Sequence, residues 1–359
     1  MPTDATPAAV GCRWPAEWEP HAATWVAWPH NRDTWPGRFD VVPPVFARLV
    51  RTIAQFEPVK ILAGGEQVLA QAESFVGDLP NVTLLDIETD DAWCRDHGPT
   101  FLVQSPGSSL ALVDWQYNAW GGKYPPFDRD NAVPRQIAKR ILCRRFSANL
   151  VLEGGAIEGN GQGTILTTET CLLNPNRNPG VDRAQAERLL GDYLGATTVI
   201  WLPRGELSGD DTDGHVDQLA RFVDPSTVVV AISEDRLDEN YEPLQENCNF
   251  LRRASEQDGN QLCVVPLPLP APKCFQTQRL PASYCNFYIA NGLVAVPQFD
   301  DRADEQALRI LAELFPQREV RGIPSLDLVW GLGAVHCLTQ QEPAGAGTTP
   351  LCRTATVNA

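Results

Sequence analysis

The stretch SYCNFYIANGLVAVPQFDDRADEQALRILAELFP, residues 283–316, indicates the fold class of this chain most clearly. A polar cluster at its start leads into a β-rich run, residues 287–299. The run that follows, residues 304–315, is acidic at its start and carries apolar residues at three-to-four spacing up to Pro316. These are the signals of an amphipathic helix with a defined beginning and end. The stretch therefore predicts strands followed by a helix.

The same order recurs along the chain, at intervals of roughly 50 to 70 residues. The sequence predicts strands in the ranges 23–29, 100–104, 109–115, 164–174, 226–232, 287–299 and 333–340. It predicts helices in the ranges 42–56, 131–142, 183–194, 241–257 and 304–315. Each repeat would consist of a polar turn, two strands and a helix, beginning near Glu19, Asp90, Glu153, His215 and Ser283. This alternation favours an α/β fold, while residue identity between the units is negligible.

Composition narrows the class of protein. The chain has 359 residues, no apolar run of the length that spans a membrane, and an N-terminus without the basic start and apolar core of a signal peptide. Its ten cysteines lack the spacing of a disulfide framework, so we expect reduced thiols in the cytoplasm. The net charge of −16 disfavours nucleic acid and anionic lipid as partners and permits a small cationic one. We expect irregular ends over the first fifteen residues or so and from Glu342 onward.

Two residues are candidates for nucleophilic chemistry. Cys337 follows a glycine-rich turn, and we predict that it is the nucleophile. The neighbouring His336 would point to the opposite face of a strand, so we interpret it as a packed or hydrogen-bonded residue. His215 is the better partner, because cysteine–histidine pairs are usually distant in sequence. It lies in GDDTDGHVDQ, residues 209–218, where Asp217 would share its face of an extended strand. We assign four other cysteines to buried packing: Cys143, Cys171, Cys248 and Cys263.

The acidic residues of the polar clusters point to a cationic substrate. Asp96, Glu153, Asp211 and Asp217 cannot all be ionised in one cleft unless a cation neutralises them. A metal bound by His215, Asp217, Asp211 and Cys337 is one alternative, but the chain lacks the usual zinc-ligand spacings. A guanidinium is planar, permanently charged and rich in N–H donors that suit carboxylates. We therefore favour attack by a thiolate on a guanidinium carbon.

Seven motifs of this sequence resemble those of a known enzyme family. The chain closely resembles the agmatine deiminases, members of the guanidine-modifying enzymes that include the bacterial-type peptidylarginine deiminases. The similarity runs from about residue 14 to residue 343. It rests on AEWEPHAATWVAWPHNRDTWPG (16–37), AWCRDHGPTF (92–101), LEGGAIE (152–158), LTTETCLLNPNRNP (166–179), GDDTDGHVDQLARF (209–222), YCNFYIANGLVAVPQF (284–299) and GLGAVHCLTQQEP (331–343).

The resemblance implies a single catalytic domain over residues 1–359 with a pentein fold, a pseudo-fivefold α/β propeller of five ββαβ-like units. It also implies hydrolysis of agmatine, a step of polyamine biosynthesis, to N-carbamoylputrescine and ammonia through an S-amidino-cysteine, without metal or organic cofactor.

By the same resemblance, Cys337 matches the nucleophile and His215 the general acid and base. Asp96 and Asp217 match the carboxylates that hold the guanidinium, and Glu153 the acid that orients the histidine. Asp211 is matched to a carboxylate that contacts bound agmatine, and Trp93 to a ring packed on its alkyl chain.

Three hypotheses remain at this stage: an agmatine deiminase, a deiminase of free or peptidyl arginine, and a non-catalytic module that binds polyamines or guanidines. We favour the first, because the motif neighbourhoods are acidic or aromatic and offer no cation for the carboxylate of arginine. The oligomeric state stays open, with a homo-oligomer among the options.

Overall fold

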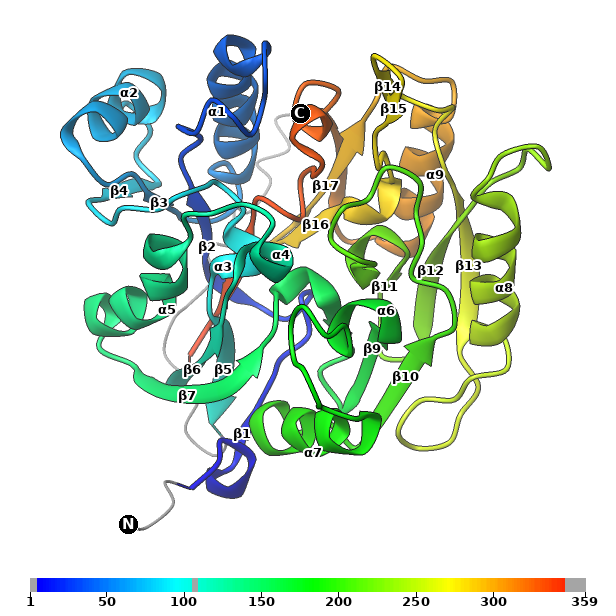
Figure 1. Cartoon of the computed structure of the whole chain (residues 1–359). Coiled ribbons are helices and arrows are strands. Elements are labelled where there is room, and N and C mark those ends of the chain that lie inside the picture. Colours follow the sequence, from blue (N-terminus) through cyan, green and yellow to red (C-terminus); the bar gives the residue numbers. More distant parts are fainter. Residues whose placement is uncertain (1–4, 105–108, 346–359) are drawn as a thin grey trace, which may run out of the picture.

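The chain forms a mixed α/β fold in the computed structural model, which describes residues 5–104 and 109–345 (Figure 1). Within these residues the strands pair into five sheets of three or four strands and one short two-stranded hairpin. Every one of the five larger sheets combines antiparallel and parallel pairing. The α/β class predicted from the alternating runs is therefore observed, with mixed sheets.

Three sheets repeat one connection pattern. A first strand pairs antiparallel with a central strand, and a helix then carries the chain to a third strand that is parallel to the central one. The helix is needed because two parallel strands cannot be joined by a tight turn. The sheets and their helices are β8 (Ile157–Gly159), β9 (Thr164–Thr168), α7 (Arg183–Leu194) and β10 (Thr198–Leu202); β11 (Ala220–Phe222), β12 (Thr227–Ile232), α8 (Tyr241–Leu251) and β13 (Cys263–Pro268); and β16 (Tyr288–Ala290), β17 (Leu293–Gln298), α9 (Asp304–Leu314) and β18 (Glu319–Pro324).

The two four-stranded sheets extend this pattern. In one, β1 (Cys12–Arg13) is added beside β5 (Thr100–Gln104), β6 (Ser109–Gln116), α5 (Asp128–Ile141) and β7 (Arg144–Val151). The other has the order β19 (Gln340–Pro343), β2 (His21–Ala27), β3 (Val59–Leu62) and β4 (Val82–Leu85), with α1 (Val42–Ile53) and α2 (Glu66–Val76) as connections. Because β19 pairs with β2, the last described strand joins one of the first.

The longer helices lie at the periphery in Figure 1, and three short ones lie nearer the middle. The short ones are α3 (Cys94–His97), α4 (Ala119–Gly122) and α6 (Glu169–Leu172). Helix α1 shows why the outer helices pack as they do, since Phe46, Leu49, Val50 and Ile53 form one fully buried stripe. The remaining elements are β14 (Cys274–Phe275), β15 (Gln278–Arg279), and the 3-10 turns η1 (Ala8–Val10), η2 (Phe39–Val41), η3 (Gly154–Ala156), η4 (Val216–Gln218), η5 (Tyr284–Asn286) and η6 (Val329–Gly331).

The predicted starts of the repeat units fit the observed sheets. Glu19, Asp90, Glu153, His215 and Ser283 precede β2, β5, β8, β11 and β16, respectively, one strand in each of the five sheets. The polar clusters therefore lie in the turns that lead into these strands, which brings their side chains to the ends of several sheets.

Several predicted boundaries are wrong. The strand predicted over 164–174 ends at Thr168, whose side chain accepts the amide N–H of Cys171 and so caps α6. Most of the range 333–340 is a series of turns, and only Gln340 belongs to a strand. Glu342, predicted to start an irregular tail, lies within β19, and its carboxylate accepts a hydrogen bond of 2.6 Å from Trp25. The part of the predicted tail from residue 346 onward lies outside the described residues. At the other end, β1 lies within the predicted irregular segment.

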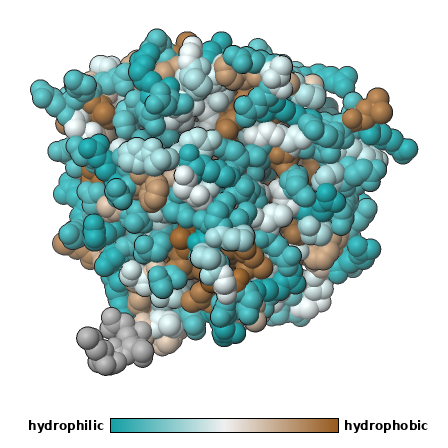
Figure 2. All heavy atoms as spheres, in the orientation of Figure 1, coloured by the Kyte–Doolittle hydropathy of each residue, from teal (hydrophilic) through white to brown (hydrophobic). Residues whose placement is uncertain are grey.

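The surface is largely polar on the face shown in Figure 2, with hydrophobic residues scattered among hydrophilic ones. Among the helices of the described residues, none combines the length and apolar character that crossing a bilayer requires.

Candidate active site

The thiol of Cys337 lies in a buried turn, with 5% of the residue exposed. Its sulfur accepts a hydrogen bond from Asn286 Nδ2 at 3.1 Å and lies 3.7 Å from Asp217 Oδ2. The chain before it can run close to two indole rings because it carries glycines there. A Cβ at Gly333 would come within 2.4 Å of the Trp93 ring. The glycines thus set the path of this turn by letting the backbone approach the indole rings closely.

His336 is held by two carboxylates and does not contact the sulfur. Its Nδ1 lies 2.7 Å from Asp217 Oδ2, and its Nε2 lies 2.9 Å from Glu17 Oε2. The interpretation of His336 as a hydrogen-bonded residue is confirmed. Its contact with Asp217 fixes the position of that carboxylate beside the thiol.

Asp96 and Asp217 are both buried near the nucleophile. Asp96, on α3, accepts the N–H of Gly155 and the indole N–H of Trp120, each at 3.0 Å. Asp217, on η4, has one oxygen, Oδ1, that is buried and has no hydrogen-bond partner within the described chain. A carboxylate oxygen left without a donor in a buried site is costly, so it is suited to accept an N–H from a ligand.

His215 lies between the carboxylates of two other elements. Its Nδ1 is 3.7 Å from Asp96 Oδ1, and its Nε2 is 3.9 Å from Glu153 Oε2. It lies immediately before η4, so the extended strand predicted for His215 and Asp217 is replaced by a tight turn. Both ring nitrogens lack a hydrogen-bond partner among the described residues. The imidazole therefore interacts with these two carboxylates through charge, without a hydrogen bond.

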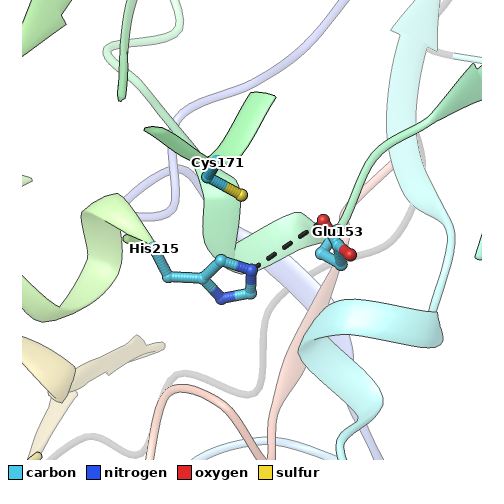
Figure 3. A group of neighbouring side chains, drawn as sticks. All are labelled: Glu153, Cys171 and His215. Carbon is cyan, nitrogen blue, oxygen red and sulfur yellow. Dashed lines mark ion pairs between the residues drawn. The ribbon is translucent and has the colours of Figure 1, made fainter. Parts of the chain in front are cut away.

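Figure 3 shows Glu153 and Cys171 beside the imidazole ring of His215. The atoms that these three residues would offer to a metal ion all lie within 4.8 Å of one another. Zinc accepts such atoms, although Glu153 also receives a hydrogen bond of 2.7 Å from Arg177. This group differs from the metal alternative considered from sequence.

Of the cysteines assigned to buried packing, Cys171 and Cys248 are buried, whereas Cys143 is partly exposed and Cys263 is exposed, so the prediction is wrong for these two. Cys171 also contacts the site, which the sequence did not indicate.

The charges of the site shift its proton equilibria. Burial raises the pKa of Asp96 to about 6, and the nearby carboxylates of Asp217 and Glu153 contribute to this shift. Burial disfavours the imidazolium of His215, but Asp96, Cys171 and Glu153 outweigh it and raise the pKa of His215 well above its usual value. Burial, followed by the charges of Asp217 and Asp96, raises the pKa of the Cys337 thiol well above its usual value. The empty site therefore favours a neutral thiol and a charged imidazole.

Two other carboxylates keep their charge. Burial disfavours ionised Glu153, but the nearby imidazole of His215 and the ion pair with Arg177 lower its pKa below the usual value. Burial likewise disfavours ionised Asp217, and the hydrogen bond from His336 outweighs it and lowers the pKa of Asp217.

Cys337 and Asp96 lie on the wall of a cavity of about 540 Å³. Trp93 and Asp211, the two further residues predicted to contact a substrate, line the same cavity. Among the described residues its wall holds one lysine, Lys123, which forms an ion pair of 2.9 Å with Asp213. The aspartates of the wall are Asp33, Asp90, Asp91, Asp96, Asp130 and Asp211.

This excess of acid makes the cavity suited to a cation. Burial raises the pKa values of Asp91 and Asp130 to about 7 each. A cation bound between such carboxylates would favour their ionised forms.

Two residues of the site were not identified from the sequence. Asn286, which contacts the sulfur, belongs to the polar cluster YCNFYIANG, which had been noted without a role for any one residue. Arg177, which pairs with Glu153, is the one cation in the asparagine- and proline-rich run NPNRNP. The turn residues around it predict only the local backbone, so the sequence carried no signal of its pairing with Glu153.

Comparison with known proteins identifies relatives over nearly the whole chain. The model of the Porphyromonas-type peptidyl-arginine deiminase family matches residues 13–343. An agmatine deiminase of Stutzerimonas stutzeri is 41% identical over 363 residues, which cover 95% of this chain and 98% of that protein. A solved agmatine deiminase of Enterococcus faecalis is 33% identical with a TM-score of 0.90, covering 95% of this chain and 98% of the other. An amidinotransferase of Microseira wollei, 12% identical with a TM-score of 0.50 over 93% of this chain and 97% of its own, shares the fold alone.

Proposed function

Since this chain belongs to the family of Porphyromonas-type peptidyl-arginine deiminases, we propose that it hydrolyses agmatine to N-carbamoylputrescine and ammonia. The observation that carries the proposal is that Cys337 and Asp96 line one acidic cavity. Asp217 lies against the sulfur of Cys337, and His215 lies against Asp96. Cys337, Asp96 and Asp217 are the residues closest to the proposed reaction. Relatives named as agmatine deiminases, at about 40% identity over nearly their full length, support the same activity.

Binding begins with the guanidinium between two carboxylates. Asp217 Oδ1 accepts one of its N–H groups, which gives this buried oxygen the partner it lacks in the empty site. Asp96 accepts a second N–H group and is ionised by the arriving cation. The positive charge also opposes the effect of Asp217 and Asp96 on Cys337, so it favours the thiolate. The substrate thereby helps to form its own nucleophile.

In the first chemical step, Cys337 Sγ forms a bond to the guanidinium carbon and gives a tetrahedral adduct. His215, held as imidazolium by Asp96 and Glu153, transfers a proton to a terminal nitrogen. The carbon–nitrogen bond breaks, ammonia leaves, and an S-amidino-cysteine remains.

In the second step, neutral His215 takes a proton from a water molecule whose oxygen attacks the same carbon. The carbon–sulfur bond breaks, the electron pair returns to Cys337, and the hydroxyl proton of the adduct passes to the departing thiolate as the neutral ureido product is released. One imidazole thus acts first as acid and then as base.

Agmatine suits the cavity better than arginine does. Agmatine carries a second positive charge and no carboxylate, whereas arginine would bring its carboxylate to a wall of aspartates. Lys123, the one lysine of the described wall, is already paired with Asp213. Unfavourable charge contacts of this kind are an effective means of rejecting a competitor.

The test is release of ammonia from agmatine, free arginine and an arginine-containing peptide by the purified protein. We expect release from agmatine that is lost in Cys337→Ser. Release from arginine or the peptide but not from agmatine would identify the chain as a deiminase of those substrates. Binding of agmatine without turnover would support the non-catalytic alternative.

We further propose that the five sheets are the five units of a pentein propeller in one catalytic domain. The repeated connection pattern and the pairing of β19 with β2 support this arrangement. The product would enter polyamine biosynthesis. The proposed compartment is the cytoplasm, where a catalytic thiol stays reduced.

A further inference from the structure

Thr168 joins the two segments that carry Cys171 and His215. Its hydroxyl donates to the carbonyl oxygen of Gly214 at 2.6 Å and accepts the backbone N–H of Cys171 at 3.4 Å. The two segments also pack closely, because a Cβ at Gly214 would come within 2.6 Å of Thr170 Oγ1. The fold itself therefore sets the cysteine beside the histidine.

Glu153, Cys171 and His215 form a buried group whose side chains face one another (Figure 3). Each residue is at most 1% exposed, and the atoms that they would offer to a metal ion all lie within 4.8 Å of one another. His215 Nε2 lies 3.9 Å from Glu153 Oε2 and has no hydrogen-bond partner among the described residues. The proposed reaction uses Glu153 and His215 but gives the thiol of Cys171 no part.

The spacing of these atoms is close to that of a zinc site. Zinc binds cysteine sulfur at about 2.3 Å and histidine nitrogen or carboxylate oxygen at about 2.0–2.2 Å. In a tetrahedral site two such donors are then about 3.3–3.7 Å apart. The limit of 4.8 Å for the group exceeds these values by no more than about 1.5 Å. Small rotations of the three side chains would close the group around an ion.

Neighbouring residues would orient two of the ligands from outside. Asp96 Oδ1 lies 3.7 Å from His215 Nδ1, the ring nitrogen that is not paired with Glu153. A carboxylate at this nitrogen holds its proton and leaves the other nitrogen for a metal. Arg177 donates to Glu153 Oε1 at 2.7 Å, so the oxygen nearer the imidazole, Oε2, is the one left for an ion. Zinc ligands are commonly supported by outer partners of this kind.

The donor atoms and their charge favour zinc over magnesium and calcium. A thiolate, an imidazole and a carboxylate offer sulfur, nitrogen and oxygen, whereas magnesium and calcium prefer oxygen alone. The thiolate and the carboxylate together carry two negative charges, which balance the charge of the ion. A balanced group is the form in which buried charges cost least.

A second acidic cavity reaches the same two segments. Its volume is about 500 Å³, and its wall includes Thr170 and Gly214, the residues immediately before Cys171 and His215. Negative charge on a cavity wall raises the local concentration of cations. Zinc therefore has an approach to the group other than the cavity beside Cys337. The carboxylates of this wall are Glu169, Glu206, Asp210 and Asp213.

We propose that Glu153, Cys171 and His215 form an inhibitory zinc site. Zinc replaces the proton on Nε2 of His215 and the proton of the Cys171 thiol, and both protons pass to solvent. The imidazole then has no nitrogen with which to exchange a proton with substrate or water, because its Nδ1 faces Asp96. The inhibition rests on the proposed function in taking His215 as acid and base, whereas the binding of zinc does not.

The first experiment measures zinc binding without substrate, by competition with a chromophoric zinc chelator. The parent protein for this test carries Cys263→Ser, Cys274→Ser and Cys352→Ser, which remove two exposed thiols and one outside the described residues. We expect a single zinc ion per chain. Loss of an outer partner alone weakens metal binding tenfold to hundredfold, so loss of a ligand in Cys171→Ser should weaken it about hundredfold or more.

Cys248→Ser is the matched control. It removes a buried thiol on α8 that does not belong to the group, so it should bind zinc as the parent protein does. Equal affinity in Cys171→Ser and the control, or a parent protein that binds no zinc, would overturn the proposal.

Cobalt shows which sulfur binds the ion. Co²⁺ enters zinc sites and absorbs strongly in the near ultraviolet when a thiolate is among its ligands. This absorption should appear in the parent protein, persist in Cys337→Ala and disappear in Cys171→Ser. Loss of the absorption in Cys337→Ala would instead place the ion on the nucleophile and refute the site. Cys337→Ala thus tests the proposal even if Cys171→Ser does not fold.

Ammonia release from agmatine measures the inhibition, with each protein compared with its own rate without zinc. At a zinc concentration about ten times its Kd, the rate of the parent protein should fall about tenfold and recover when a chelator is added. Cys171→Ser should lose less than about twofold under the same conditions, and Cys248→Ser as much as the parent. Zinc that binds at Cys171 without slowing the reaction would contradict its inhibitory role. A protein that binds zinc as expected but releases no ammonia from agmatine would refute the proposed function and leave the zinc site supported.

Discussion

Asp96→Asn should weaken catalysis and, at neutral pH, lower the electrostatic cost of the empty site. Asp96 accepts N–H groups from Gly155 and Trp120, one on each oxygen. Asparagine keeps only one acceptor, so its NH₂ group must face one of these donors. The guanidinium also loses a charged partner, a contact of about 1.5–3 kcal/mol. We therefore expect kcat/KM for agmatine to fall about tenfold to hundredfold or more.

The effect of the same substitution on stability should depend on pH. The pKa of Asp96 is raised from 3.8 to about 6 by burial and by the other carboxylates. A raised carboxyl pKa means that the folded state binds the proton more tightly than the unfolded state. The cost of ionised Asp96 is therefore absent at low pH, grows as the pH rises from about 4 to about 6, and reaches about 3 kcal/mol above that range.

Asparagine carries no charge and so removes this cost at high pH alone. The comparison is the free energy of unfolding of Asp96→Asn minus that of wild type at the same pH. This difference should be about 2 kcal/mol larger at about pH 8 than at about pH 4, in favour of the variant. The loss of one hydrogen bond lowers both values alike and cancels in this comparison.

The assay is urea denaturation of both proteins across this pH range without substrate, beside steady-state ammonia release at about pH 8. Adding agmatine should stabilise wild type more than the variant, because the cation binds ionised Asp96. A stability difference that does not change with pH, or a kcat/KM within about threefold of wild type, would falsify the assignment of Asp96 as a strained, substrate-binding carboxylate.

Three further predictions concern the surroundings of the reaction. His215→Ala should reduce turnover by about 10² to 10⁴ and leave an amidino adduct that mass spectrometry detects, whereas a wild-type rate would exclude His215 from proton transfer. Arg177→Gln leaves Glu153 buried without its arginine partner and should cost about 3–5 kcal/mol in denaturant unfolding; its control Arg183→Gln, at an exposed pair, should cost at most about 1 kcal/mol. Treatment with a chelator should leave ammonia release unchanged, and activity that is lost and then restored by zinc would support the metal alternative at His215 instead.

Most of the helices of this chain were predictable from its sequence, but the strand that follows each crossover helix was not predicted. These strands are β3, β4, β7, β10, β13 and β18. The helices that begin at Val42, Arg183, Tyr241 and Asp304 were predicted with their starting residues, because each has a clear apolar stripe. Helix α2 (Glu66–Val76) was missed because only two of its residues, Ala72 and Val76, are fully buried, so its apolar pattern is weak. The pairing of strands between distant segments, such as β19 with β2, leaves no local signal at all.

Only some residues of the candidate active site were predictable from the sequence. Cys337 and His215 could be proposed as catalytic residues from the sequence, because cysteine and histidine often act as nucleophile and base and both lie in polar clusters. Asn286 could not be assigned to the site in this way, because an asparagine in a turn is ordinarily a local backbone partner. Its contacts depend on Asp217 and on the turn at residue 336, which are 69 and 50 positions away in the chain. Such contacts follow from the arrangement of three segments, and no single segment encodes them.

The charges of the site also explain how one cavity can bind its substrate and release its product. Without a ligand, Asp217 and Asp96 disfavour the thiolate, so Cys337 rests as a neutral thiol. Agmatine brings a guanidinium that compensates both carboxylates and permits ionisation of the sulfur. The ureido group of the proposed product carries no charge, so its formation would leave the two carboxylates without compensation and the thiolate again disfavoured. Hydrolysis therefore removes the charge that held the substrate in place, and the product leaves a site that has returned to its resting ionisation.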